Sequence, residues 1–206
     1  MHTRLSLTGL LLLLFSYDAA VAGDPVKGKT KAALCIGCHV PDGHNPDPLI
    51  PNLSGQVADY IIEELLDYQT GRRRDPIMSA IVKTLTSTED LLDISAYYAA
   101  LPRMSGSGRS TASGKRGKAL FEHERCIFCH GDAGISDAPF LEGAPVIGGQ
   151  NKQYLLKTLK DIRAGKREAD KFGLMKKVLS RQSDEDIEAI AEFTSSLTAV
   201  SATSKD

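Results

Sequence analysis

The four cysteines of this chain fall in two copies of one pattern, Cys-x-x-Cys-His. The two copies consist of Cys35, Cys38 and His39, and of Cys126, Cys129 and His130. Thiols and an imidazole at this spacing suit three chemistries. These are a redox-active dithiol, a zinc site, and the covalent attachment of haem with the histidine bound to its iron.

The order of the residues in both copies favours haem. Two thiols separated by two residues on one helical turn reach both vinyl groups of a single haem, and the next residue then lies beneath the ring to bind iron. A redox dithiol is expected in a βαβ context, which this chain lacks. A zinc site does not explain a histidine after the second cysteine in both copies. The sequence therefore predicts two covalently bound haem c groups.

A haem bound by one histidine keeps an open axial position, which electron carriers usually fill with Met or a second His. Met78 and Met175 stand at matching places in the two halves, in expected loops before the last helix of each, and we predict that they are the axial ligands. The alternative for such a residue is core filling. We expect Met104 to be structural or exposed, and the rival ligands His44 and His123 to be solvated surface residues.

The residues around the two motifs also recur, which indicates an internal duplication. Each half has a Gly-Lys pair, a Pro-x-x-x-Gly-Gln segment, a tyrosine four residues after its glutamine, and a glycine that closes a helix. The repeated residues are Gly28, Lys29, Pro51, Gly55, Gln56, Tyr60 and Gly71, and Gly117, Lys118, Pro145, Gly149, Gln150, Tyr154 and Gly165.

The apolar pattern predicts the same three main helices twice and no strand. The expected ranges are 25–39, 57–70 and 88–100, and then 115–130, 151–164 and 184–197. In the last helix of each half, apolar residues recur at i, i+3, i+7 and i+10, which is one face of a helix. The fold class is therefore all-α.

The first 22 residues read as a cleaved export signal. Arg4 precedes an apolar run over residues 5–15, and Ala20-Val21-Ala22 forms a small-x-small cleavage site. The apolar run is too short for an uncleaved membrane anchor. We expect cleavage after Ala22, a first domain over 23–104, a flexible Ser/Gly-rich linker over 105–113, and a second domain over 114–206.

The repeat resembles the dihaem cytochrome c4 family of bacterial class I c-type cytochromes. The resemblance covers nearly all of the mature chain and is carried by the haem motifs, by the repeated Pro, Gly-Gln and Tyr residues, and by the two Met positions. It implies two class I cytochrome domains packed face to face, each around one His/Met haem. It also implies that Pro51 and Pro145 offer carbonyls to the Nδ1 atoms of the haem histidines. The first half departs from this pattern at two positions. Val40 replaces the glycine that follows the motif, and Ala32 stands where the second half has Phe121. Both positions concern the packing of the first domain.

These features indicate a periplasmic electron carrier between respiratory redox partners, such as a quinol-oxidising complex or dehydrogenase and a terminal oxidase. The alternative is a haem-bearing subunit of a larger oxidoreductase, such as a sulfide or alcohol dehydrogenase. A dihaem peroxidase needs an open iron, which Met78 and Met175 argue against. The net charge of −1 indicates no nucleic-acid partner, and peripheral membrane association is left open. Basic residues at 72–74 and 166–167 are expected to form solvated faces, and the alternative is contact with haem propionates or with a partner.

Overall fold

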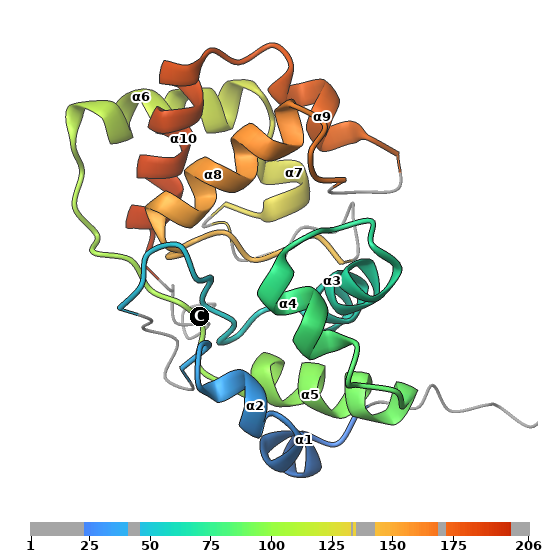
Figure 1. Cartoon of the computed structure of the whole chain (residues 1–206). Helices are drawn as coiled ribbons and strands as arrows, with labels where there is room; N and C mark the ends of the chain where they lie inside the picture. The colour runs from blue at the N-terminus through green and yellow to red at the C-terminus, as the bar shows by residue number, and fades with distance from the viewer. Residues whose placement is uncertain (1–22, 41–45, 133, 135–142, 169–171, 199–206) are drawn as a thin grey trace, which may run out of the picture.

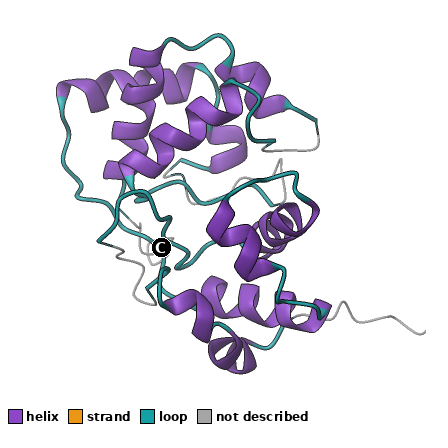
Figure 2. Cartoon of the chain, viewed as in Figure 1, coloured by secondary structure: helices purple, strands orange, loops and turns teal. Residues whose placement is uncertain are grey.

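The computed structural model describes residues 23–40, 46–132, 134, 143–168 and 172–198. The expected export signal and His44 lie outside these residues. Over the described ranges the chain is all helical, without strands (Figures 1 and 2). The helices are α1 (Pro25–Lys31), α2 (Ala33–Ile36), α3 (Ala58–Thr70), α4 (Pro76–Val82), α5 (Thr88–Ala100), α6 (Ala112–His123), α7 (Ile127–His130), α8 (Lys152–Arg163), α9 (Leu174–Leu179) and α10 (Asp184–Ser196).

The helices form two groups with the same internal arrangement. In the first group α1 and α3 both pack on α5, and α4 lies against α3; in the second, α6 and α8 both pack on α10, and α9 lies against α8. Figure 1 shows α6–α10 gathered at the top and α1–α5 at the bottom. No helix within the described ranges is long and apolar enough to cross a bilayer.

The ends of the main helices follow from their local sequence. Ser183 and Asp186 form a reciprocal capping box at the start of α10, and Ser87 caps α5 through the backbone N–H of Glu89. Gly71 ends α3 with a φ of 77°, a left-handed conformation that glycine adopts without steric cost. The main helices therefore lie within one to three residues of the expected ranges, except where α1 and α2, and α6 and α7, divide each expected first helix in two.

Each half has a close helix crossing at a glycine. A Cβ atom at Gly28 would overlap the backbone carbonyl of Asp93, and a Cβ atom at Gly117 would overlap that of Ala189. The glycine of the repeated Gly-Lys pair therefore lets the first helix of each half lie directly on the last. One turn later, Phe121 is buried and meets Phe193 edge-on, with ring centroids 5.5 Å apart.

One expectation about irregular segments is wrong. Met78 and Met175 lie in the short helices α4 and α9 rather than in loops. Asp75 nucleates α4 by accepting hydrogen bonds from the N–H groups of Ile77 and Met78, each at 3.0 Å. At the start of the expected linker, the N–H groups at 106 and 108 donate to carbonyls at the end of α10 over 2.7 and 2.9 Å.

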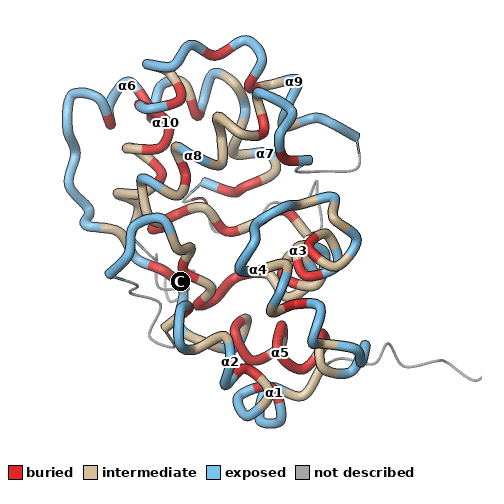
Figure 3. Tube along the Cα trace, in the orientation of Figure 1, coloured by how far each residue is buried: buried red, intermediate tan, exposed pale blue. Residues whose placement is uncertain are grey.

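The two groups of helices meet through two equivalent loops. We call residues 51–56 the first proline loop and residues 145–150 the second proline loop. In both loops the glycine N–H donates to the last helix of its own half over 2.9 Å, Gly55 to Tyr98 and Gly149 to Thr194. Figure 3 shows buried stretches of chain running between the upper and lower helices.

Candidate haem sites

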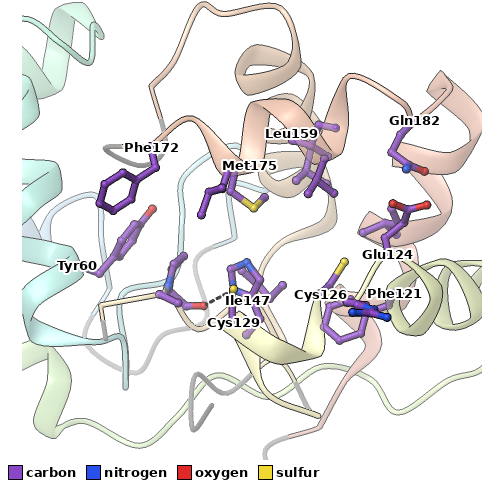
Figure 4. A pocket seen from close by; sticks show the side chains of 18 of the residues that line it. Tyr60, Phe121, Glu124, Cys126, Cys129, Ile147, Leu159, Phe172, Met175 and Gln182 are labelled. Atoms are coloured by element: carbon purple, nitrogen blue, oxygen red, sulfur yellow. Dashed lines mark hydrogen bonds between the residues drawn. The ribbon is translucent and has the colours of Figure 1, made fainter. Parts of the chain in front are cut away.

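The second cysteine motif opens onto a mostly apolar cavity of about 310 Å³. Cys126, Cys129, His130 and Met175 all line it. Figure 4 shows Met175 on one side, facing Cys126 and Cys129 on the other, with Tyr60 and Phe172 at one end. The structure thus brings both thiols, the imidazole and the thioether to one cavity, although they come from segments as far apart as α7 and α9.

Both motif histidines are oriented by a proline carbonyl, as the resemblance implied. His130 Nδ1 donates to the carbonyl of Pro145 over 2.9 Å, and His39 Nδ1 donates to that of Pro51 over 3.0 Å. A carbonyl oxygen only accepts, so Nδ1 carries the proton and Nε2 keeps its lone pair. Burial lowers the pKa of His130 and is also the main cause of the lowered pKa of His39. Each imidazole is therefore neutral, with Nε2 ready to bind a metal.

None of the four cysteines forms a disulfide. Burial raises the pKa of Cys126 to about 11 and raises that of Cys35 as well. The chain enters the second motif through Arg125, whose φ of 60° is unusual for a residue other than glycine. Sequence reasoning gave no indication of this left-handed turn, which redirects the chain between α6 and α7.

In the first half, the candidate ligand and thiol contact one buried core. Cys35 and Met78 pack against the same cluster, which includes Ile61, Leu65 and Tyr98. The hydroxyl of Tyr98 donates to the backbone carbonyl of His39 over 3.3 Å and so ties the motif to α5. The apolar groups expected around a haem are therefore supplied by α3, α4 and α5.

A buried ionic cluster lies between the two halves. Glu64 on α3 accepts hydrogen bonds from Arg73 of its own half and from Arg167 of the other half. Arg73 also donates to the hydroxyl of Tyr154 over 3.0 Å, and Arg167 donates to that of Tyr60 over 2.7 Å. The expectation of a solvated basic face is wrong for these two arginines, because both side chains are largely buried and each bonds to a residue of the opposite half.

Among the described residues, the cluster carries two guanidinium groups and one carboxylate, so these groups together hold an excess positive charge. Although burial raises the pKa of Tyr154, the two arginines outweigh burial and hold that pKa below its usual range. The buried Nε atom of Arg167 has no hydrogen-bond partner in the part of the chain that the structure describes. Arg167 lines a second cavity of about 100 Å³ together with His130 and Met175. An uncompensated cation and an unpaired donor beside a candidate haem ligand fit a carboxylate, and haem carries two propionates.

The remaining candidates take structural or surface positions. His123 is exposed and pairs with Glu124, as expected for a surface histidine. Met104 is buried, and its sulfur accepts a hydrogen bond from Gln150 Nε2 over 3.3 Å. Within the described ranges no three His, Cys, Asp or Glu residues gather in one group that could hold a metal ion.

Comparison with known proteins agrees with this arrangement. The family model described as Cytochrome c matches residues 114–198. Cytochrome c4 of Pseudomonas aeruginosa is 34% identical over 201 residues, which cover 94% of each chain. The thiosulfate dehydrogenase electron acceptor of Thiomonas intermedia is 29% identical over 94% of this chain and 90% of its own.

The fold has a solved counterpart. The crystal structure of reduced recombinant cytochrome c4 from Pseudomonas stutzeri superposes with a TM-score of 0.77 at 31% identity, covering 85% of this chain and 100% of that one. The helical fold and the cysteine motifs define a c-type cytochrome of class I. The chain belongs to the cytochrome c4 family, and it is an electron-transfer protein rather than an enzyme.

Proposed function

We propose that this protein is a periplasmic electron carrier with two covalently bound haem c groups. It passes electrons from a quinol-oxidising complex or a dehydrogenase to a terminal oxidase. The observation that carries the proposal is the cavity of the second half. It brings together two thiols, a neutral imidazole whose Nε2 can bind a metal, and a thioether. Bound there, haem supplies an iron that cycles between Fe(II) and Fe(III).

In this proposal each haem is held by four residues of the chain. In the first half, Cys35 and Cys38 form the thioethers, and His39 and Met78 are the axial ligands. In the second half, these roles belong to Cys126 and Cys129 and to His130 and Met175. His/Met ligation raises the reduction potential and leaves no open position on the iron, which suits electron transfer.

The two haems define two domains, over 23–104 and 114–206, joined by the linker at 105–113. The first 22 residues direct export and are removed after Ala22, so the carrier works in the periplasm, either soluble or peripherally bound to the membrane. Fractionation and the intact mass of the exported protein test this assignment. A mature chain that still contains residues 1–22 contradicts it.

The experiment that tests the haem assignment combines mass and spectra. We expect the exported protein to carry the mass of two haems and to show the Met–Fe(III) charge-transfer band. Met78→Ala and Met175→Ala should each remove about half of that band. Met104→Leu is the control, because Met104 lies outside both candidate sites, and it should keep the whole band. An unchanged band in both alanine variants refutes the ligand assignment.

The second candidate is a dedicated electron acceptor or haem subunit of a larger oxidoreductase, in the class of the sulfide and alcohol dehydrogenases. The relative from Thiomonas intermedia, named as an electron acceptor of thiosulfate dehydrogenase, favours this candidate. Purification from the native membrane and periplasm separates the two. A stable complex with a dehydrogenase supports the subunit, and a free dihaem chain reduced by a quinol-oxidising complex supports the carrier.

A further inference from the structure

Each proline loop is held by a glutamine side chain from the opposite half. Gln150 Oε1 accepts from the N–H of Asn52 and Gln150 Nε2 donates to the carbonyl of Asn52, both over 2.9 Å. Gln56 makes the same pair of bonds with Val146, at 2.7 and 2.9 Å. Because Gln56 and Gln150 occupy equivalent positions of the repeat, the two contacts are reciprocal.

Neither glutamine has freedom to rotate. Both are almost fully buried. Gln56 Oε1 also accepts from the N–H of Val57 over 3.0 Å, and Gln150 Oε1 accepts from that of Asn151 over 2.9 Å. Turning either amide would leave buried donors and acceptors unpaired, which costs about 1–3 kcal/mol for each group.

The peptide units held by the glutamines are the same units that hold the haem histidines. The N–H of Asn52 and the carbonyl of Pro51 belong to one planar peptide unit. Gln150 binds the N–H side of that unit, and His39 binds its carbonyl side. In the other half, Gln56 and His130 bind the two sides of the Pro145–Val146 unit in the same way.

A hydrogen bond at one end of a peptide unit polarises it and strengthens the bond at the other end. A stronger bond to Nδ1 makes a histidine a more basic metal ligand. We propose that Gln56 and Gln150 are positioning residues that act across the two halves. Each glutamine sets the orientation and basicity of the axial histidine in the half opposite its own. This inference rests on the proposed haem sites and adds a direct link between them.

The test uses the dihaem holoprotein with Gln150→Met and Gln56→Met, which remove the amide and keep the side-chain length. Intact mass first establishes that wild type and variants carry two haems; a wild type without them refutes the proposed function instead. Backbone amide exchange and haem-resolved midpoint potentials are then measured. We expect Gln150→Met to speed exchange at Asn52 and to raise only the potential of the haem at Cys35/Cys38. Gln56→Met should act on Val146 and on the other haem.

Gln69→Met is the matched control. Gln69 also donates two amide hydrogen bonds to backbone carbonyls, those of Val82 and Leu85, but both lie in its own half. Its substitution should leave the haem at Cys126/Cys129 unchanged. If a methionine variant does not fold, the corresponding Gln→Asn variant takes its place, because it keeps a polar amide but is one methylene too short to make the bond to the opposite peptide unit. The proposal is overturned if each glutamine acts mainly on the haem of its own half, on both haems equally, or on neither.

Discussion

Replacing Glu64 by glutamine should destabilise the contact between the two halves. Among the described residues, Glu64 has the one carboxylate that accepts from both Arg73 and Arg167, and the three side chains are between 7% and 15% exposed. Glutamine has nearly the same shape, so the substitution removes the charge and leaves two buried guanidinium groups uncompensated. Losing one partner of a buried ion pair costs about 3–5 kcal/mol, and we expect that range for Glu64→Gln.

The assay is urea unfolding of the holoprotein at neutral pH, followed by far-ultraviolet circular dichroism. Urea carries no charge and therefore does not screen the cluster. Glu63→Gln is the matched control, since Glu63 is the preceding residue of α3 but is exposed. Its effect should stay within about 0.5 kcal/mol. A Glu64→Gln variant that unfolds at the same urea concentration as this control refutes the role given to the cluster.

We also expect the destabilisation caused by Glu64→Gln to depend on pH. Burial raises the pKa of Glu64, but Arg167 and Arg73 outweigh burial and hold it below its usual range. The stabilisation from this carboxylate is therefore complete above the unfolded pKa of about 4.3 and is lost as the pH falls through the lower native pKa. The difference in stability between wild type and Glu64→Gln should shrink over that acidic window. A difference that stays constant down to the acid limit contradicts this sign.

Two further predictions concern helix packing and haem attachment. Gly117→Ala should lower stability by about 1–3 kcal/mol, because the added Cβ would overlap the carbonyl of Ala189. Gly114→Ala is the control on the same helix, since its added Cβ meets no backbone atom, and it should be nearly neutral. Thermal unfolding of both variants measures the difference. Replacing Cys126 and Cys129 together by serine should leave the mass of one haem on the chain, and a variant that keeps two refutes the assignment of the second motif.

The sequence alone determined the class of fold, the haem motifs and the repeat. The spacing of the cysteines and the apolar periods and caps of the main helices are local patterns, so the sequence alone was enough to predict them. The recurrence of the Pro-x-x-x-Gly-Gln segment also identified Pro51 and Pro145 through the family resemblance. The structure confirmed that both carbonyls accept from the histidines of the two cysteine motifs.

The tertiary structure decided what joins the two halves. Arg73 and Arg167 belong to basic runs that are typical of a solvated surface, and only the approach of α3 to the segment after α8 buries them around Glu64. Gln56 and Gln150 were visible as repeated residues, but their partners lie 90 and 98 residues away along the chain. Contacts over such separations depend on how whole domains dock, and that docking is set by the summed burial of many side chains rather than by a local pattern.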